Sequence, residues 1–385
     1  MRIALEMLGL IPGQVGGMEA YARNLIKGLS NARPSHEFLL LVGREAKGTF
    51  AEARCRFEEF VADTSMPSWC GGFRYCQSAW HLAASIKKLK SWKHDVLHCI
   101  MTLPKPPWGA KNMVLTIHDL NFESLPELWG RGQLLAMKTL CRLGAKVADR
   151  IITVSNDAKR TIVERYSVPE ARIDVIFIGI DREVFSPSLD KIRDSEAITH
   201  FHLPTEFLVF PANTWPHKNH LGLLEALAIL RDEFRLAPYV VLTGTQKHGH
   251  AKMLNATASL GLKNQIRWLG YVTRHELVAL YRRAHALVFP SLYEGFGVPV
   301  IEAMACRCPV VCSKTTATGE VAGGAALTFD PNDPADIATG IARIITDGAL
   351  RQDLIAKGQN RAADFSLDRM ARETLRIYEE VASGR

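Results

Sequence analysis

Short apolar runs alternate with helix-period segments along almost the whole chain, and this alternation limits the fold more than any other feature. Near-continuous apolar strands separated by helices are typical of parallel sheets that helices cover on both faces. In the first half, helical patterns such as Glu19–Leu29 and Leu134–Val147 separate six predicted strands: Ile3–Met7, Phe38–Val42, Val96–Ile100, Met113–Ile117, Ile151–Val154 and Ile173–Ile176. This half therefore predicts a doubly wound α/β domain.

The alternation stops at residues 181–205, a polar segment with two prolines that predicts a linker. It resumes with five further predicted strands: Phe207–Phe210, Tyr239–Leu242, Ile266–Trp268, Ala286–Phe289 and Val310–Cys312. We therefore predict two doubly wound α/β domains, residues 1–185 and residues 186–365. Residues 366–385 predict an amphipathic helix that packs back on the first domain, because nothing downstream needs it as a crossover.

The composition is that of an ordinary globular protein, with 385 residues, 47% hydrophobic and 23% charged. This excludes a disordered chain and a coiled coil. No run of 18 apolar residues occurs, and the first residues include Glu6 and no apolar signal segment, so a cytoplasmic protein is expected. The eight cysteines are too few for a disulfide framework. Cys306, Cys308 and Cys312 lack a second ligand pair at metal spacing, so reduced thiols and no metal are expected.

The net charge of +7 is unevenly distributed. Residues 64–118 contain seven bases, one acid and four of the seven tryptophans: Trp69, Trp80, Trp92 and Trp108. A basic stripe recurs at every fourth position of a predicted helix: Lys138, Arg142, Lys146 and Arg150. Bases beside tryptophans suit an anionic membrane surface or single-stranded nucleic acid, whereas the alternative is a solvated face beside core tryptophans. We expect peripheral association with the inner face of the cytoplasmic membrane and no nucleic-acid partner.

Ligands of open α/β sheets bind beyond the carboxyl ends of the strands, so the loops after predicted strands are the candidate sites. The most informative loop reads PSLYEGFGVPVIEAMA over residues 290–305. Its glycines bring a ligand close to the backbone, and Pro299 fits the first helical position. The amides of a helix N-terminus then face an anion such as a diphosphate. Glu294 and Glu302 lie on either side of these glycines as acceptors for sugar hydroxyls.

Glu294 and Glu302 form an E-x7-E motif, and the surrounding sequence resembles the donor site of family 4 retaining glycosyltransferases. The resemblance implies the GT-B fold, in which two Rossmann-like domains face each other across a cleft and the C-terminal domain binds a nucleotide sugar. It implies that Glu294 contacts a sugar hydroxyl and Glu302 the ribose. The alternative is that Glu302, in the first turn of the predicted helix, stabilises the helix N-terminus by about 0.3–1 kcal/mol. The intervening donor-binding residues are Gly295, Phe296, Gly297 and Val298.

Another loop of the second half carries Lys218 at a predicted helix entry, a point charge suited to a phosphate. The resemblance assigns Lys218 to the donor and to catalysis, Asn213 to the cleft wall and Gly244 to the donor site. An ordinary surface lysine is the alternative for Lys218. The family usually has an arginine six positions earlier, where this chain has Ala212, so half of the diphosphate clamp is unassigned. Arg307 stands where the family usually has glycine.

In the first half, Gly16 and Gly17 are not spaced as G-x-G-x-x-G, so a nicotinamide dinucleotide site is poorly supported. The resemblance makes them the glycine pair that faces the donor phosphates and the acceptor, whereas an ordinary turn is the alternative. It places His118 beside the transferred sugar as a catalytic residue, and Ser155 in the cleft wall. A core or capping role for His118 and an N-cap role for Ser155 are the alternatives.

Together these features and the resemblance predict a glycosyltransferase that moves a hexose from a nucleotide-diphosphate sugar to a glycan or lipid-linked glycan of the bacterial surface. The resemblance implies that the transfer retains the anomeric configuration. Similarity to bacterial polysaccharide mannosyltransferases favours GDP-mannose, with UDP-sugars as the alternative donors. No D-x-D pair occurs, so neither a metal nor another cofactor is expected. The other candidates are a sugar-nucleotide epimerase and a non-catalytic nucleotide-sugar-binding protein. A glycosidase fits less well, because Glu294 and Glu302 bracket one helix start.

Overall fold

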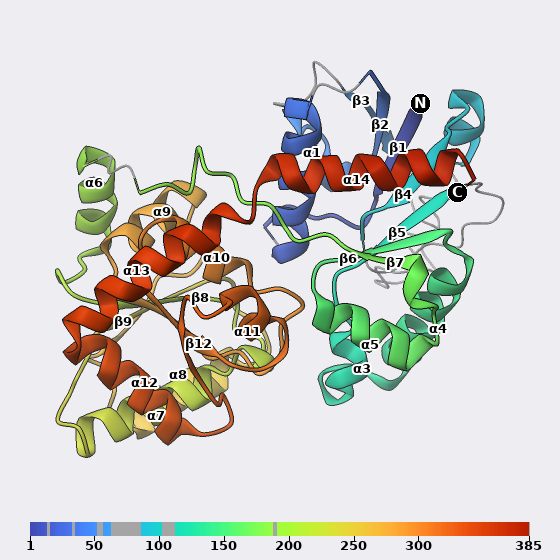
Figure 1. Cartoon of the computed structure of the whole chain (residues 1–385). Helices are drawn as coiled ribbons and strands as arrows, with labels where there is room; N and C mark the ends of the chain where they lie inside the picture. The colour runs from blue at the N-terminus through green and yellow to red at the C-terminus, as the bar shows by residue number, and fades with distance from the viewer. Residues whose placement is uncertain are drawn as a thin grey trace. The chain divides into compact units, whose positions relative to one another are not determined.

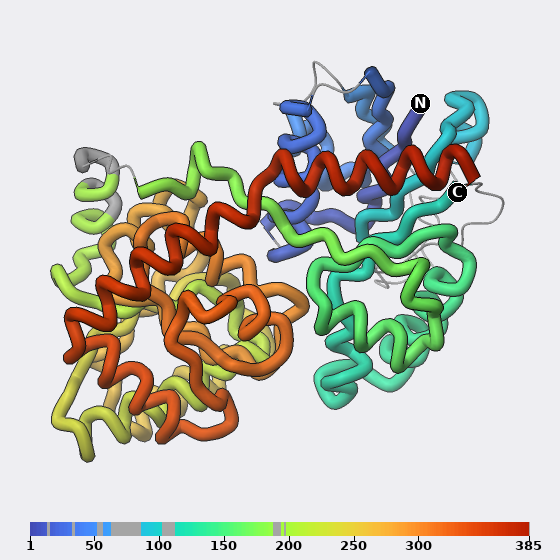
Figure 2. Tube along the Cα trace, in the orientation of Figure 1, coloured from blue at the N-terminus to red at the C-terminus, as the bar shows by residue number. Residues whose placement is uncertain are grey.

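The computed structural model describes residues 1–13, 16–32, 35–51, 57–62, 86–101, 112–187 and 191–384. The chain divides into two compact units, each built on one parallel sheet (Figure 1). They comprise Met1–Gly179 with Leu367–Arg385, and Ile180–Ser366. The colours of Figure 2 show that the first unit combines the N-terminal half with the C-terminal helix. The second unit begins at Ile180, slightly ahead of the predicted boundary.

The first unit contains a parallel sheet of seven described strands in the order β3-β2-β1-β4-β5-β6-β7. They are β1 (Arg2–Met7), β2 (Glu37–Gly43), β3 (Phe57–Ala62), β4 (Val96–Cys99), β5 (Met113–Ile117), β6 (Arg150–Thr153) and β7 (Ile173–Val175). Six of them coincide with predicted apolar runs. The sequence pattern misses β3, because Glu58 and Glu59 interrupt its apolar residues at the edge of the described sheet.

Alternate strand residues point to opposite faces of this sheet, so each face has its own helices. One face contributes Leu97 and Leu115 to a core that includes Met137 of α4. The opposite face carries His98, whose ring contacts Tyr378 of α14. The helices of this unit include α1 (Gly17–Ala32), α3 (Asn121–Ser124), α4 (Arg131–Val147), α5 (Asn156–Tyr166) and α14 (Leu367–Ala382), and α14 lies beside α1 (Figure 1).

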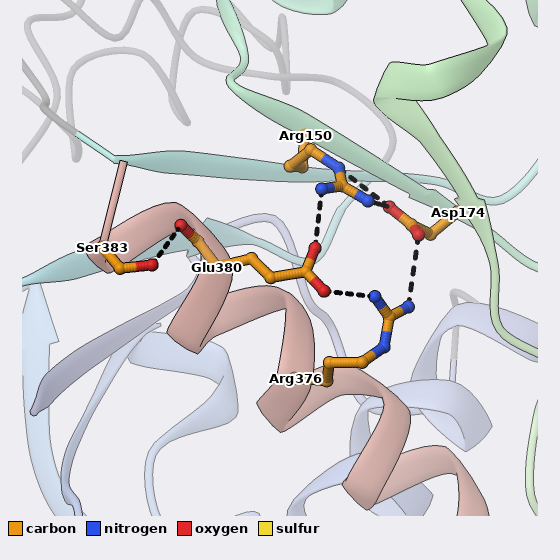
Figure 3. A network of polar contacts seen from close by, with 5 residues as sticks. All are labelled: Arg150, Asp174, Arg376, Glu380 and Ser383. Carbon is orange, nitrogen blue, oxygen red and sulfur yellow. Dashed lines mark hydrogen bonds and ion pairs between the residues drawn. The ribbon is translucent and has the colours of Figure 1, made fainter. Parts of the chain in front are cut away.

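A ring of four charged side chains holds α14 on the last two strands (Figure 3). Arg150 of β6 contacts Asp174 of β7 at 2.6 Å and Glu380 of α14 at 2.7 Å. Arg376, one turn earlier on α14, contacts both Glu380 and Asp174 and closes the ring. The C-terminal helix is therefore tied to the first unit by charge as well as by apolar packing.

The basic stripe predicted on α4 is interrupted. Lys138 pairs with Glu123 at 2.8 Å, and Arg150 belongs to the ring of Figure 3. Only Arg142 and Lys146 of the stripe are exposed. No helix among the described residues is long and apolar enough to cross a bilayer. Much of the predicted basic window lies outside the described residues, including Trp69, Trp80 and Trp108.

The second unit contains a parallel sheet in the order β10-β9-β8-β11-β12-β13. Its strands are β8 (Leu208–Pro211), β9 (Val240–Thr243), β10 (Ile266–Trp268), β11 (Ala286–Phe289), β12 (Val310–Ser313) and β13 (Leu327–Phe329). Its helices are α6 (Lys191–Phe201), α7 (His220–Asp232), α8 (His250–Ser259), α9 (Arg274–Arg283), α10 (Val298–Ala305), α11 (Thr316–Ala322), α12 (Pro334–Thr346) and α13 (Gly348–Ala363). The five predicted strands are present, and β13 is added at the edge.

The prediction of a linker over residues 181–205 is wrong, because this segment contains α6. The helix packs against α9 of the same unit. Arg282 of α9 donates to Asp194 of α6 at 3.1 Å, and both side chains are less than 10% exposed. A buried ion pair therefore contributes to a contact that apolar periodicity does not reveal.

Candidate functional site

The strand order of the second sheet reverses between β8 and β11, which is where open α/β sheets bind ligands. Lys218 follows β8 and Glu294 follows β11. The Lys218 Nζ lies 2.6 Å from the Glu294 Oε1, and the side chains are 19% and 11% exposed. The structure thus brings together, at the expected edge, two predicted site residues that are far apart in the sequence.

Asn219 joins three loops around this ion pair. Its backbone is left-handed (φ 62°), and its Oδ1 accepts a hydrogen bond from the amide of Gly222 at the start of α7. Its Nδ2 donates to the carbonyls of Pro290 (3.1 Å) and Pro331 (2.7 Å). Sequence reasoning missed this residue, although an asparagine directly before a helix is an N-cap signal. Asn219 fixes the Lys218 loop against the Glu294 loop.

Two further hydrogen bonds fix the backbone next to Glu294. The amide of Leu292 donates to the carbonyl of His217 at 2.8 Å, so the two loops share a main-chain bond. The amide of Glu294 donates to the hydroxyl of Thr316 at 3.2 Å. The loop backbone is thus held by its neighbours while the Glu294 carboxylate faces the Lys218 ammonium.

Helix α10 begins at Val298, one residue before the predicted start, and Pro299 is its second residue. The preceding Gly297 has φ 96°, a conformation that non-glycine residues rarely adopt. The side chain of Phe296 is 4% exposed and contacts the ring of Phe365. An anion at this helix start would therefore meet main-chain amides and not the aromatic ring.

Glu302 lies beyond the first turn of α10, contrary to the prediction. The stabilisation of a helix N-terminus falls off within that turn, so the alternative role for Glu302 loses its support. Its Oε2 accepts a hydrogen bond from the hydroxyl of Tyr281 at 3.1 Å. Burial raises the pKa of Glu302 to about 7, although the charge of Arg274 and the Tyr281 bond oppose the rise. The carboxyl is therefore partly protonated at neutral pH.

Three buried polar atoms near these loops have no hydrogen-bond partner within the described chain. They are the Ser291 Oγ, the Thr318 Oγ1 and the His217 Nδ1. A Cβ placed on Gly297 would lie 3.7 Å from the Thr318 Oγ1, so this hydroxyl is close to the start of α10. Buried polar groups normally have partners, so these atoms fit a site that a polar ligand completes.

Asn213 and Gly244 connect the ends of β8 and β9. The Asn213 Oδ1 accepts hydrogen bonds from the amide and the hydroxyl of Thr245. Gly244 has φ 122°, and a Cβ there would lie 2.6 Å from the carbonyl oxygen of Ala212. The loop structure alone therefore explains why asparagine and glycine occupy these two predicted site positions. Lys247, in the loop after β9, supplies a second cation, 5.8 Å from the centre of the Trp215 ring.

The predicted residues of the first unit follow the carboxyl ends of their own strands. Gly17 opens α1, and the carbonyl of Gly16 accepts a hydrogen bond from the amide of Glu19. Ser155 is fully buried, and its Oγ caps α5 by accepting from the amide of Ala158 at 3.1 Å. The N-cap role, which the sequence left open for Ser155, is present in the structure.

His118 follows β5 and is 7% exposed. Its Nε2 lies 2.9 Å from the carbonyl oxygen of Ile100, and its ring meets that of Tyr21 edge to face. Burial lowers the pKa of His118 to about 4, so the ring is neutral at pH 7. A carbonyl only accepts, so the Nε2 carries the proton and the Nδ1 is the unprotonated nitrogen.

Comparison with known proteins supports the interpretation of both units. Residues 15–184 match the family model described as Glycosyltransferase Family 4, and residues 192–361 match that described as Glycosyl transferases group 1. The chain belongs to the family 4 glycosyltransferases. The predicted enzyme class is thereby confirmed.

The relatives of this glycosyltransferase include O-antigen chain mannosyltransferases of bacteria. It is 29% identical to O-antigen chain mannosyltransferase B of Escherichia coli over 71% of each chain. It is 26% identical to D-inositol 3-phosphate glycosyltransferase of Salinispora arenicola over 86% of this chain and 73% of that one. The crystal structure of WaaG, a glycosyltransferase involved in lipopolysaccharide biosynthesis, matches with a TM-score of 0.77, 13% identity and all of both chains covered. That likeness confirms the predicted GT-B fold.

The structure shows the backbone at a position where this glycosyltransferase departs from its family pattern. Arg307 has φ 64°, the left-handed conformation that favours glycine, directly after α10. Its amide donates to the carbonyl of Met304, as in a helix C-terminal turn. The position therefore suits the glycine that the family usually has, and the exposed arginine occupies the same turn.

A buried polar chain in the first unit of the glycosyltransferase escaped sequence reasoning. The Nδ1 of His98 lies 2.6 Å from the Tyr378 hydroxyl, and its Nε2 lies 2.7 Å from the Thr116 hydroxyl. Thr116 in turn contacts the hydroxyl of Tyr21, the ring that meets His118. The sequence signal that could have revealed it is His98, a single histidine within the apolar strand β4. The chain links α14 to the support of His118.

No group of three or more potential metal ligands of the histidine, cysteine, aspartate and glutamate types occurs among the described residues. Cys306, Cys308 and Cys312 are all buried and reduced. Burial raises the pKa of the Cys312 thiol to about 12, so it stays protonated at neutral pH. These thiols belong to the core of the second unit.

Proposed function

We propose that this glycosyltransferase transfers mannose from GDP-mannose, with retention of the anomeric configuration, to a growing or lipid-linked glycan. The similarity to O-antigen chain mannosyltransferase B supports the sugar and the acceptor class. The observation that carries the donor site is the contact of Lys218 with Glu294 at the point where the strand order reverses. A lysine and a glutamate there provide one group for a phosphate and one for sugar hydroxyls.

The departing nucleoside diphosphate gains negative charge as the glycosidic bond breaks. In our proposal, Lys218 and the amides at the start of α10 stabilise this charge, because they are already in place before reaction. Lys218 is paired with a single carboxylate in the structure. A diphosphate carries more charge, so it competes for the ammonium and releases Glu294 to accept from a sugar hydroxyl.

The remaining groups have roles that follow from their protonation states. Glu302 accepts hydrogen bonds from the ribose, and its elevated pKa couples nucleotide binding to proton release near neutral pH. His118, which burial keeps neutral at pH 7, lies beside the transferred sugar and contacts it without adding a charge. No step in this proposal needs a metal ion or another cofactor.

A thermal-shift panel of GDP, UDP, ADP and their sugar conjugates, with EDTA present, tests the donor site. A ligand at 100 times its Kd adds about 2.7 kcal/mol to the free energy of unfolding, which gives a readable shift. Stabilisation by GDP conjugates in EDTA supports the proposal. Selective stabilisation by UDP conjugates would mean that the donor is a UDP-sugar and not GDP-mannose. An absence of any shift contradicts the site.

The products distinguish the remaining reactions. Transfer of mannose to an acceptor with the same anomeric configuration, seen by NMR, supports a retaining transferase. Conversion of the nucleotide sugar without acceptor indicates an epimerase, and binding without turnover indicates a nucleotide-sugar-binding protein. The similarity to D-inositol 3-phosphate glycosyltransferase favours a second acceptor candidate, an inositol phosphate, which belongs in the same assay.

We also propose that the enzyme works in the cytoplasm at the inner face of the cytoplasmic membrane, where a lipid-linked acceptor would be presented. The net charge of +7 supports attraction to anionic lipid. The basic stripe does not carry this proposal by itself, since Lys138 and Arg150 are paired within the protein.

A further inference from the structure

The outer face of α4 exposes a strip of large apolar side chains. Leu135, Leu143 and Val147 are 68%, 55% and 54% exposed. Single exposed leucines are ordinary, but here three of the large exposed hydrophobic side chains among the described residues lie on one helix. This strip requires an explanation beyond the packing of α4, whose opposite face carries the buried Met137 and Cys141.

The same helix is basic. Arg131, Arg142 and Lys146 are exposed, and α4 contains no aspartate or glutamate. Within the described part of the chain, none of the three forms an ion pair with a carboxylate. The exposed face of α4 therefore combines an apolar strip with net positive charge, as in helices that lie in a membrane interface.

A hollow of about 360 Å³ lies at the C-terminal end of α4. Arg142, Lys146 and Arg172 line it together with Tyr166 and Ser167. Main-chain carbonyls hold the Nη2 atoms of both guanidinium groups: Arg142 donates to the carbonyl of Arg165, and Arg172 to that of Lys146. Three cations thus line this hollow, and two of them, Arg142 and Lys146, directly precede the exposed Leu143 and Val147 in α4.

We infer that the outer face of α4, with this hollow, docks on a bilayer of anionic phospholipid. Leu135, Leu143 and Val147 enter the boundary between headgroups and acyl chains, while Arg142, Lys146 and Arg172 meet lipid phosphates. A second copy of the chain fits this face less well, because a two-fold contact would bring the same cations together. The inference rests on the proposed membrane-linked acceptor and names the surface that reaches it.

Vesicle flotation with the full chain tests the inference, using phosphatidylcholine alone or mixed with phosphatidylglycerol. We expect flotation only with the anionic mixture. The double variant Arg142→Gln/Lys146→Gln should lower the partition coefficient roughly 25-fold, since each cation near the surface contributes roughly fivefold. Leu135→Ser/Leu143→Ser should abolish flotation. The matched control on the exposed face of α8, Lys252→Gln/Leu254→Ser, should float like the wild type.

Equal flotation with neutral lipid, no flotation of the wild type, or full flotation of both α4 variants would overturn the inference. Sedimentation velocity without lipid identifies the competing occupant: a dimer that Leu135→Ser/Leu143→Ser dissociates means that a second copy covers the face, which also overturns it. Unchanged melting midpoints show that the variants fold. The nucleotide thermal-shift panel, run on the full chain, reports on the Lys218–Glu294 site and not on α4. Failure of the donor site and failure of membrane docking therefore give different results.

Discussion

The predicted site residues of the two units differ in what they contact. In the second unit, Lys218 and Glu294 contact each other, and each charged group can bind a ligand in place of its partner. In the first unit, His118 contacts the carbonyl of Ile100, and Ser155 caps a helix. Both groups are uncharged at pH 7, and each has a partner within the first unit. We therefore expect changes at Lys218 and Glu294 to reduce function at nearly constant stability, and changes at the buried polar groups of the first unit to reduce stability.

The largest effect should follow Glu294→Ala. Removal of the carboxylate takes away the hydrogen bond to the sugar, and we expect transfer to fall by two orders of magnitude or more, about 2.7 kcal/mol. The partly exposed Lys218 can turn to water, so the melting midpoint should change little. Initial rates and thermal melts measure both quantities. Asp353→Ala, which breaks the exposed pair with Lys357, is the control. Near-normal turnover of a folded Glu294→Ala would contradict the site.

Lys218→Met should weaken nucleotide binding next. A charge-assisted hydrogen bond contributes about 1.5–3 kcal/mol, so the Kd of the nucleoside diphosphate should rise roughly 10- to 150-fold. Isothermal titration calorimetry in EDTA measures it, with Lys314→Met as the control because Lys314 forms an exposed pair with Asp330. A comparable loss of nucleotide affinity in Lys247→Met would indicate that Lys247 binds the diphosphate in place of the arginine that the family usually has at the position of Ala212. An unchanged Kd in Lys218→Met would remove the lysine from the donor site.

The buried His98 makes the stability of the first unit depend on pH. Burial, with a smaller effect from nearby His118, lowers the pKa of His98 to about 3 from 6.5. The unfolded chain then binds more protons between these values, so stability is fully present above pH 6.5 and falls as the pH decreases. At pH 5 this histidine alone should cost about 2 kcal/mol relative to pH 7.

Urea unfolding of wild type and His98→Gln at pH 7 and pH 5 measures that contribution. The variant loses part of its contacts with Tyr378 and Thr116, so it should be less stable at pH 7. Its further loss between pH 7 and pH 5 should be smaller than that of the wild type. An identical pH dependence in both proteins would mean that His98 does not titrate as its burial indicates.

The smallest effect should come from Glu302→Gln, which should raise stability at high pH while it weakens nucleotide binding. The folded pKa of about 7 exceeds the usual 4.5, so this carboxyl makes wild-type stability fall as the pH rises from 4.5 to 7. At pH 8 the variant should be more stable by about 1 kcal/mol, since burial of the amide offsets part of the gain. Its nucleotide affinity should nevertheless decrease. Denaturant melts at pH 5 and pH 8 test this, and a variant less stable at pH 8 would contradict it.

Much of the fold was predictable, because apolar runs and helical periods are local properties. Eleven of the described strands coincide with predicted runs, and only the edge strands β3 and β13 were missed. The helix α6 could not be predicted from periodicity, since a buried pair of Asp194 and Arg282 contributes to its packing. Similarly, the role of Asn219 could not be predicted, because the carbonyls that its side chain contacts belong to loops distant in sequence.

The sequence by itself determined the class of fold and the donor motif, because strand burial, glycine-rich loops and the E-x7-E spacing all lie within short segments. Only the tertiary structure decided which side chains meet. The contact of Lys218 with Glu294, the ring that binds α14, and the chain from Tyr378 to His118 all join residues that are distant in sequence. Such contacts depend on strand order, which hydrophobic periodicity does not encode.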